Sequence, residues 1–288
     1  MRVLVIGGNG MLGRDTVAAF RHAHETFSAD RLVGDYTVDI TQRASVDALL
    51  AAAKPDVAVN CAAYTNVDGA EREPDEAYRV NAWGVWNLGA ACAAADVDLL
   101  HVSTDFVFNG EASVPYTEFD RPNPINVYGA SKWAGEQALQ WSGARYWIVR
   151  TQWLYGIHGK NFAYTMMRLA KERTEIPVVE DQRGAPAYAV DVAEIIRTVV
   201  EGCPPGVYHA NNAGECSWYE FARAIVERAG HNPDMIRPIP ASQYPTPTRR
   251  PAYSTLRRYS LELQGLDTVR PWPAALDDFM EKALAGAA

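Results

Sequence analysis

The sequence has few cysteines, few histidines and no long hydrophobic run. Its four cysteines, among 288 residues, show no CxxC spacing, so we expect neither a disulfide framework nor a zinc site. The six histidines lack the spacing of metal ligands, and we assign no metal site. No apolar stretch is long enough to span a bilayer, and Met1 and Arg2 lead directly into an apolar segment without the features of a signal peptide. These absences predict a cytoplasmic protein with no membrane partner.

Positive charge is scarce as well. The chain has 27 lysines and arginines against 35 aspartates and glutamates, a net charge of -8. This charge argues against a nucleic-acid partner, because nonspecific binding needs a basic surface. The length allows two domains, or one α/β domain with an appendage. Arg249 and Arg250 are a local basic exception, suited to a small anionic ligand.

Short apolar strands alternate with segments of helical periodicity through the first half of the chain. This alternation is typical of a parallel sheet with helices on both faces, and right-handed crossovers then give a doubly wound, Rossmann-type α/β fold. Long helices are expected over about 75–95 and 126–141. The expected strands are Arg2–Ile6, Thr26–Ala29, Val57–Cys61, Leu99–Ser103 and Tyr146–Arg150.

The alternation weakens after Arg150, where loop signals and a proline-rich stretch over 238–251 become frequent. We expect a smaller C-terminal lobe that binds a substrate. Two apolar runs, Ile176–Val179 and Gly206–His209, are expected to be strands that rejoin the main sheet. The expected dinucleotide-binding domain covers 1–151 and about 176–212, and the substrate-binding lobe covers about 152–175 and 213–288.

A glycine-rich loop joins the first expected strand to the first helix. Gly7, Gly10 and Gly13 have GxxGxxG spacing, with Met11 and Leu12 between the last two. Glycines here let the backbone approach a pyrophosphate and aim the free N–H groups of a helix N-terminus at its charge. The alternative is a glycine-rich turn that binds nothing, but the agreement of strand, loop and helix favours a dinucleotide site.

Other candidate cofactor residues follow the next strands. An acidic residue about 20 positions further on is expected to bind the adenosine ribose, and Asp30 is the best placed. Arg31 beside it suits a 2′-phosphate, so NADPH and NADH both stay open. Asp39, followed by Ile40, either contacts the adenine or caps the next helix. Small residues and a tyrosine follow the third strand at the carboxyl edge, where such sheets bind ligands: Ala62, Ala63 and Tyr64.

Tyr128 and Lys132 lie four residues apart on an expected helix. This spacing places the lysine on the same helical face as the tyrosine. A tyrosine can act as a general acid near neutral pH only if its phenolate is stabilised, and a nearby positive charge does this. The alternative is an ordinary surface pair at helical spacing. The pair and the glycine loop together indicate a nicotinamide-dependent oxidoreductase.

Further segments complete a pattern in the same order along the chain. They are Asp39-Ile40-Thr41, Ala62-Ala63-Tyr64-Thr65, Ser103-Thr104-Asp105-Phe106-Val107-Phe108, Arg150, Trp153-Leu154-Tyr155-Gly156, Asp181-Gln182-Arg183-Gly184 and Arg250-Pro251. With these segments, the chain resembles the extended short-chain dehydrogenase/reductase superfamily and, within it, the dTDP-4-dehydrorhamnose reductase family. The resemblance covers most of the chain.

The resemblance implies roles for three residues. Tyr128 is the expected proton donor, Lys132 is expected to bind the nicotinamide ribose and lower the pKa of the tyrosine, and Thr104 is expected to hydrogen-bond the substrate carbonyl and the phenol. The chemistry agrees, because a hydride delivered to a ketone leaves an alkoxide that an O–H donor must protonate and a hydroxyl can stabilise.

The resemblance also implies substrate contacts. Sugar-nucleotide 4,6-dehydratases carry an Asp-Glu pair where this chain has Asp105 and Phe106, which favours a plain ketone reduction with Asp105 orienting a sugar hydroxyl. Trp153 either packs on the sugar or belongs to the core. Arg250 either binds the substrate diphosphate or is a solvated charge.

The expected function is therefore the NAD(P)H-dependent reduction of the 4-keto group of a dTDP-4-dehydro-6-deoxyhexose. One alternative is a nucleotide-sugar epimerase, which uses the same tyrosine and lysine but retains its cofactor. Another is a non-catalytic dinucleotide-binding regulatory subunit. The resemblance further implies that two copies can pair as a homodimer.

Overall fold

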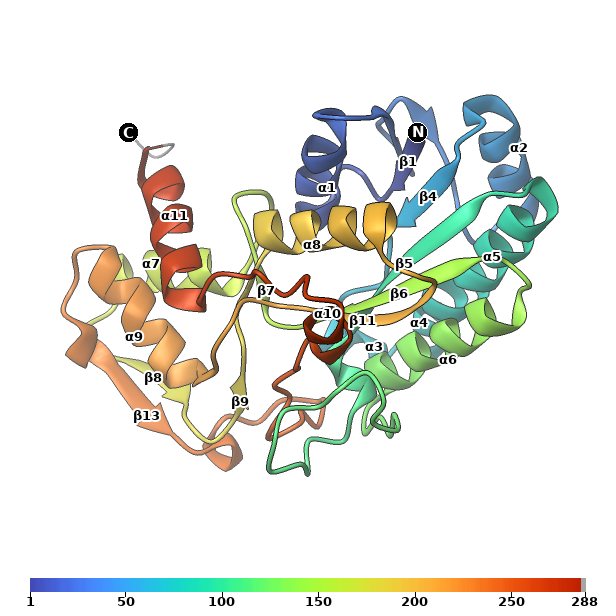
Figure 1. Cartoon of the computed structure of the whole chain (residues 1–288). Helices are drawn as coiled ribbons and strands as arrows, with labels where there is room; N and C mark the ends of the chain where they lie inside the picture. The colour runs from blue at the N-terminus through green and yellow to red at the C-terminus, as the bar shows by residue number, and fades with distance from the viewer. Residues whose placement is uncertain (286–288) are drawn as a thin grey trace.

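Seven parallel strands form the central sheet of the computed structural model, which describes residues 1–285 (Figure 1). The order across the sheet is β11-β6-β5-β4-β1-β2-β3, which confirms the doubly wound α/β fold. Each of the first five expected strands is found within one residue at either end, and β3 is an additional short strand. The strands are β1 (Arg2–Ile6), β2 (Glu25–Asp30), β3 (Tyr36–Thr37), β4 (Val57–Asn60), β5 (Asp98–Thr104), β6 (Tyr146–Thr151) and β11 (Gly206–Ala210).

Helices cover both faces of this sheet. Along β1, Val3 and Val5 pack with the residues of α1 and α8, whereas Leu4 and Ile6 pack with those of α2 and α5. The alternation of side chains along a strand thus supplies a core to each face. Figure 1 shows these helices on opposite sides of the strands. They are α1 (Met11–Arg21), α2 (Arg43–Ala53), α5 (Gly84–Ala95), α6 (Val127–Trp141) and α8 (Ala189–Gly202).

The helix expected over 75–95 is interrupted. It consists of α4 (Pro74–Tyr78), a π-helical turn η1 (Arg79–Trp83) and α5. A Cβ on Gly135 of α6 would lie only 2.0 Å from the carbonyl oxygen of Asn81 in this turn, so glycine allows α6 to approach it closely. The second long helix agrees with expectation, with Asn126 as its N-cap accepting from the Gly129 N–H at 2.7 Å.

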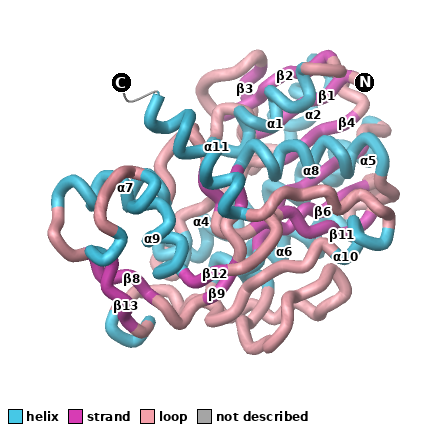
Figure 2. Tube along the Cα trace, turned by 60° about the vertical axis from the view of Figure 1, so that its left-hand side comes forward, coloured by secondary structure: helices cyan, strands magenta, loops and turns pink. Residues whose placement is uncertain are grey.

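A second group of elements surrounds its own hydrophobic core, which includes Tyr155, Tyr188, Phe221 and Phe279. Figure 2 shows α7, α9, β8 and β13 together at the end of the molecule away from β1–β3. Its strands pair as β7 (Leu154–Tyr155) with β10 (Ala187–Tyr188), β9 (Arg183–Gly184) with β12 (Cys216–Ser217), and β8 (Ile176–Val179) with β13 (Ile236–Ile239). Its helices are α7 (Phe162–Glu172), α9 (Trp218–Arg228) and α11 (Trp272–Ala285).

One expected strand pairing is wrong. Gly206–Ala210 joins the main sheet beside β6, as expected, but Ile176–Val179 pairs with Ile236–Ile239 outside that sheet. A short apolar run specifies a buried strand without specifying its partner, and here the partner lies about 60 residues downstream. The division into a dinucleotide-binding domain and a substrate-binding lobe stays a prediction.

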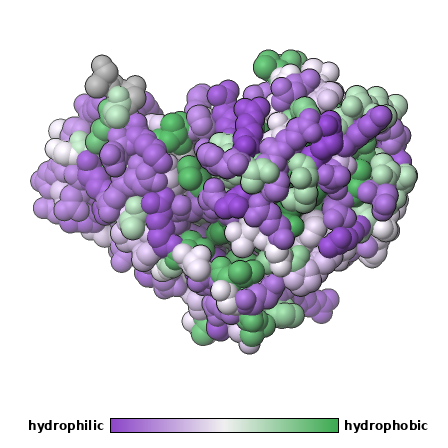
Figure 3. All heavy atoms as spheres, turned by 45° about the horizontal axis from the view of Figure 1, so that its top comes forward, coloured by the Kyte–Doolittle hydropathy of each residue, from purple (hydrophilic) through white to green (hydrophobic). Residues whose placement is uncertain are grey.

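The remaining elements are short, and they lie in the connections. Among residues 1–285, no helix has both the length and the apolar character needed to cross a membrane. Hydrophilic side chains predominate on the face in Figure 3, where hydrophobic ones form small groups. The short elements are α3 (Val67–Ala70), α10 (Tyr259–Leu263), η2 (Asp105–Val107), η3 (Pro233–Met235) and η4 (Ala241–Gln243).

Glycine is required at two positions in the loop between β1 and α1. Gly7 has a φ of +75°, and a Cβ there would lie 2.7 Å from the backbone nitrogen of Ala62. A Cβ on Gly13 would lie 2.0 Å from the carbonyl oxygen of Gly7. The loop, the start of α1 and the segment after β4 are therefore in direct backbone contact.

We expect Gly13→Ala to destabilise the protein. The new methyl group must push α1 away from the loop, and overpacking of this kind costs about 1–3 kcal/mol. Thermal unfolding followed by circular dichroism would show a lower Tm. Gly202→Ala is the control, since nothing lies within 4 Å of a Cβ there and its effect should stay within about 0.5 kcal/mol. Equal melting of the two variants would contradict the close packing of the loop.

Candidate active site

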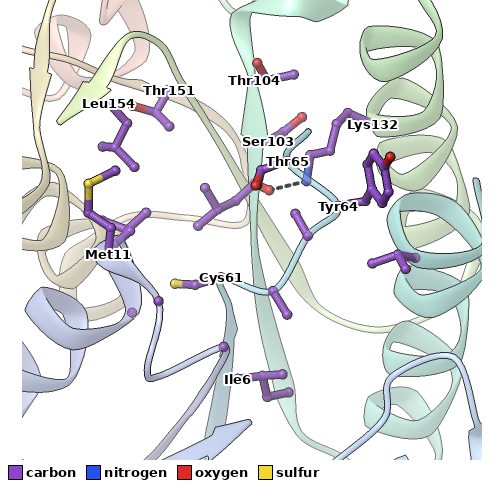
Figure 4. A pocket seen from close by; sticks show the side chains of 18 of the residues that line it. Ile6, Met11, Cys61, Tyr64, Thr65, Ser103, Thr104, Lys132, Thr151 and Leu154 are labelled. Carbon is purple, nitrogen blue, oxygen red and sulfur yellow. Dashed lines mark hydrogen bonds between the residues drawn. The ribbon is translucent and has the colours of Figure 1, made fainter. Parts of the chain in front are cut away.

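A cavity of about 810 Å³ lies at the carboxyl edge of the main sheet. It is lined by loops that follow β1, β4, β5 and β6 and by the start of α6, as the close view shows (Figure 4). Almost all of the candidate residues meet in this one cavity. They are Gly7, Gly10, Met11, Leu12, Gly13, Asp30, Arg31, Asp39, Ile40, Ala62, Ala63, Tyr64, Thr104, Asp105, Tyr128, Lys132 and Trp153.

Arg250 is the exception, because it is not among the residues that line the cavity. Its guanidinium lies 3.3 Å from the carboxylate of Asp68 in α3, and both side chains are about one-third exposed. Charge alone could not reveal this partner, which is 182 residues away in the sequence. The contact between Arg250 and a substrate diphosphate stays a prediction.

The end of the cavity near β2 has both signs of charge. Asp30 ends β2, and its carboxylate accepts hydrogen bonds from the N–H groups of Asn9 at 3.2 Å and Arg31 at 2.7 Å. These contacts tie Asp30 to the glycine loop. The exposed Arg31 lies beside it, with its side chain free to meet an anionic group at the cavity edge.

Asp39 closes a turn instead of capping a helix. Its Oδ1 accepts from the N–H of Thr41 at 3.0 Å and from the hydroxyl of Thr41 at 2.7 Å, while the N-cap of α2 is Gln42. Hydrogen bonds from Thr41, with smaller help from the positive charges of Arg31 and Arg79, keep the pKa of Asp39 below its usual value. The carboxylate is therefore ionised at the cavity wall.

These features fit a dinucleotide. The glycine loop has no side chain that blocks the approach of a phosphate to the N-terminus of α1, where Gly10 is the N-cap and makes no side-chain cap. The backbone contacts between Gly7, Gly13 and Ala62 make the floor of the cavity. The loop, Asp30 and Lys132 would hold the phosphates, the adenosine ribose and the nicotinamide ribose respectively.

Thr104 and Tyr128 bring two hydroxyl groups to the same wall. Thr104 ends β5, and its hydroxyl donates to Asp105 Oδ1 at 3.0 Å. Burial raises the pKa of the Tyr128 phenol to about 12, hydrogen bonding with Thr104 opposes the rise, and the carboxyl group of Asp105 adds to it. Phe106 packs edge-on against the phenol ring, 5.6 Å between centroids. The phenol is thus firmly protonated in this structure.

Lys132 is buried, and its side chain is turned toward β5. Nζ donates to the carbonyl oxygen of Val102 at 2.6 Å, the contact marked in Figure 4, and lies 3.1 Å from Nε2 of His101. Burial lowers the pKa of Lys132 to about 8, and the negative charge of Glu136 opposes this. The lowering of the tyrosine pKa by Lys132 stays a prediction, because Nζ here contacts His101 and Val102.

Behind the lysine, a buried ion pair joins α6 to β6. Arg150 Nη2 lies 2.7 Å from Glu136, and both side chains are nearly inaccessible to solvent. Glu136 also accepts from the hydroxyl of Ser103 at 2.5 Å, and the guanidinium stacks over Phe108 at 5.2 Å. These contacts fix α6 against the strand that ends in Thr104.

The substrate half of the cavity contains Asp105 and Trp153. Asp105 is buried, and its Oδ2 has no hydrogen-bond partner among the described residues, so it can accept from a sugar hydroxyl. Trp153 has a left-handed backbone with φ +41°. Its indole stacks on Trp218 at 3.6 Å between centroids and also lines the cavity, so packing and substrate contact are compatible for this residue.

Sequence reasoning missed several residues of the cavity wall. Thr151 ends β6 at the same edge as the other strands, and Gln152 follows it. The rule that such edges bind ligands would have found both residues. Arg79, whose guanidinium donates to the Thr41 hydroxyl at 2.9 Å, and Lys160 carry no local signal. Their position depends on contacts between distant segments.

The chain is similar to known proteins over nearly its whole length. The profile of the RmlD substrate binding domain family matches residues 1–285. A dTDP-4-dehydrorhamnose reductase of Mycolicibacterium smegmatis is 40% identical, covering 96% of this chain and 84% of the relative. A dTDP-4-keto-6-deoxy-D-glucose reductase of Streptomyces niveus is 41% identical, covering 96% and 95%. A dTDP-4-dehydrorhamnose reductase of Bacillus anthracis, solved in complex with NADP, superposes with a TM-score of 0.93 at 38% identity, covering 98% and 99%.

We expect Asp105→Asn to stabilise the protein at pH 7.5. Burial raises the pKa of Asp105 from its ordinary 3.8 to about 6, and the nearby hydroxyls of Ser254 and Thr104 oppose the rise. The ionised carboxylate therefore costs stability, on the order of 2–3 kcal/mol above pH 6. This cost falls as the pH drops from 6 toward 3.8, because the folded state then binds a proton before the unfolded state does.

The measurement is Tm as a function of pH. Asn keeps the shape of the side chain without the charge, so the variant should melt about 5 °C above the wild type at pH 7.5 and lose this advantage by pH 4. Asp75→Asn changes an exposed aspartate and should show no such pH dependence. A Tm difference that is constant with pH would rule out an ionisation effect at Asp105.

Proposed function

The chain belongs to the dTDP-4-dehydrorhamnose reductase family, and we propose that it reduces the 4-keto group of a dTDP-4-dehydro-6-deoxyhexose to an alcohol with NADPH or NADH. One observation supports this above the others. The hydroxyls of Thr104 and Tyr128 and the amine of Lys132 share a cavity with a glycine loop shaped for a pyrophosphate. The product is dTDP-L-rhamnose or a related dTDP-deoxyhexose.

The overall reaction takes up one proton as the ketone and the reduced nicotinamide become an alcohol and the oxidised nicotinamide. The bound cofactor would supply the hydride. The chain supplies the proton at the phenolic oxygen of Tyr128. The Thr104 hydroxyl, which donates to Asp105 in this structure, turns to donate its hydrogen where negative charge develops on the carbonyl oxygen. Asp105, through its unpartnered oxygen, orients a sugar hydroxyl.

The neighbours of Tyr128 support a reduction over an elimination of water. Removal of water from a hexose needs a second acidic group to carry a proton, and Phe106 stands where dehydratases have that glutamate. The Phe106 ring instead packs against Tyr128 at 5.6 Å. A nucleotide-sugar epimerase stays the alternative within enzymes, and NAD that remains bound through purification would favour it.

A regulatory subunit without catalysis is the weaker alternative, because such a protein has no need to keep Thr104, Tyr128 and Lys132 in one cavity. A cytoplasmic location accords with four free cysteines. The homodimer stays an expectation from the family.

The decisive test measures the oxidation of NADPH and NADH by the absorbance of the reduced nicotinamide, with dTDP-4-dehydro-6-deoxy-L-hexulose made enzymatically in the cuvette. The wild type should turn over. Tyr128→Phe should reduce kcat roughly 10²-fold or more, because the general acid is lost, with cofactor affinity nearly unchanged.

Tyr208→Phe is the matched control. Tyr208 lies in β11 and does not line the cavity, and its hydroxyl donates to the carbonyl oxygen of Pro204 just before that strand, so its loss should leave kcat unchanged. Failure of the wild type on a panel of dTDP-4-keto sugars, with cofactor still bound, would reject the proposed reaction. Full activity of Tyr128→Phe would remove Tyr128 from the mechanism.

Arg31 is the residue that we expect to decide between the two cofactors. Its side chain lies at the cavity edge beside Asp30, where a 2′-phosphate would meet it. Arg31→Ala should raise the KM for NADPH about tenfold, equal to about 1.4 kcal/mol, and leave the KM for NADH unchanged. Arg168→Ala, in α7 and paired with Glu172, is the control. Equal changes for both cofactors would assign Arg31 no role in the choice.

A further inference from the structure

Two fully buried polar residues, Asn60 and His101, lie behind Lys132. They are cross-strand neighbours, Asn60 at the end of β4 and His101 in β5, and both have no exposed surface. Neither lines the cavity, and the reaction described above does not use them. Their hydrogen bonds form a chain that connects the backbone N–H of Ala62 to the amine of Lys132.

The orientation of the Asn60 amide is set by the backbone. The N–H of Ala62 points at Asn60 Oδ1 at 3.1 Å, and a backbone N–H can only donate. The amide nitrogen of Asn60 therefore faces Nδ1 of His101, at 3.0 Å. Because an amide nitrogen donates and does not accept, Nδ1 of His101 must be the accepting ring nitrogen.

His101 is consequently neutral with its proton on Nε2. Burial holds the pKa of His101 well below its usual value. The Nε2–H then points at Nζ of Lys132, 3.1 Å away. An ammonium group has three donors and no acceptor, so this contact is a hydrogen bond only when Nζ is an uncharged amine with a lone pair.

Nζ also has a second partner that suits an amine. It donates one hydrogen to the carbonyl oxygen of Val102 at 2.6 Å while its lone pair accepts from His101. Each contact from Ala62 through Asn60 and His101 to Lys132 and Val102 then pairs one donor with one acceptor.

We propose that Asn60 and His101 are positioning residues that favour the uncharged amine of Lys132 in the cofactor-free enzyme, so that binding of the nicotinamide dinucleotide to this form converts it to the ammonium with uptake of one proton from solvent. The inference rests on the proposed function only in that the cavity binds NADPH. No electrons move, and the proton forms an N–H bond at Nζ. The ammonium can no longer accept a hydrogen bond from His101. It must instead donate to new acceptors, which the hydroxyls of the nicotinamide ribose supply.

The other ionisable groups around Lys132 act in known directions. Glu136, one turn further along α6, favours the ammonium, but Arg150 neutralises it from β6. Cys61, after β4, also favours the ammonium weakly, and its own thiol stays protonated because burial raises its pKa to about 12. Tyr128, on the same helix, is protonated. Burial dominates and lowers the pKa of Lys132 to about 8.

The pH range in which a proton is taken up follows from the pKa of Lys132, which is about 8 in the cofactor-free enzyme. The bound dinucleotide adds negative charge and hydroxyl acceptors, so the pKa of Lys132 rises on binding. Uptake is then small at pH 6.5, where the free lysine is already charged, and increases as the pH passes 8. Isothermal titration calorimetry of NADPH binding, in two buffers that differ in ionisation enthalpy, should give more than about half a proton per site at pH 8.5.

Two variants distinguish this proposal from proton uptake that does not depend on Asn60 and His101. In Asn60→Asp the carboxylate accepts from Nδ1–H, so the proton of His101 moves and Nε2 accepts from a charged Lys132. In His101→Gln the amide oxygen can accept from the same ammonium. Both should abolish most of the uptake at pH 8.5. His209→Gln replaces another buried histidine, whose Nδ1 contacts Arg257 far from Lys132, and should retain the uptake.

The tautomer is measured directly on the wild type without cofactor. Long-range ¹H–¹⁵N NMR of ¹⁵N-histidine protein should show His101 neutral, with its proton on Nε2, above pH 8.5, where Lys132 is an uncharged amine. A proton on Nδ1, an imidazolium form, uptake absent from the wild type, or uptake unchanged in both variants would each overturn the proposal. Because neither readout uses the sugar, uptake without sugar reduction would reject the proposed function and leave this inference standing.

Discussion

The parallel pairing of β1, β4, β5 and β6 is the constraint on which the rest of the molecule depends. Ile6 lies opposite Asn60, Asn60 opposite His101, and Thr104 opposite Thr151, so neighbouring strands end at one edge. The chain must leave the sheet there in successive loops, and those loops form the cavity. The glycine loop can close the floor only because Gly7 and Gly13 admit backbone contact. Fold and site thus share one geometric origin.

A cluster of buried polar side chains lies directly behind this edge, and its members compensate one another. Arg150 and Glu136 form an ion pair that would leave an isolated buried charge if either were removed. Asp105 and Lys132 have pKa values moved toward neutrality by burial, so neither is at its most stable as an ion. Such groups lower the free energy of unfolding, and their presence at the cavity wall indicates that they serve chemistry more than stability.

Local patterns in the sequence predicted the parts of the molecule that depend on local order. The strands follow from runs of apolar residues, and the glycine loop and the Tyr128/Lys132 pair follow from spacing within one loop or helix. The wrong expectation concerns a distant partner, because Ile176–Val179 pairs with Ile236–Ile239. Local patterns also could not reveal the contact between Arg250 and Asp68. The π-turn over Arg79–Trp83 escaped because its periodicity is too close to that of an α-helix in a short segment.

The uncharged form of Lys132 could not be predicted from the sequence for a different reason. A lysine one helical turn after a tyrosine indicates a positive charge. Burial lowers the pKa of this lysine, and its Nζ contacts the ring of His101, which the amide of Asn60 and the backbone at Ala62 orient. The phenol of Tyr128, with its pKa raised to about 12, is a poor acid until a positive charge arrives. Above pH 8, where the free lysine is mostly uncharged, cofactor binding would supply this positive charge only in the complex that can use it.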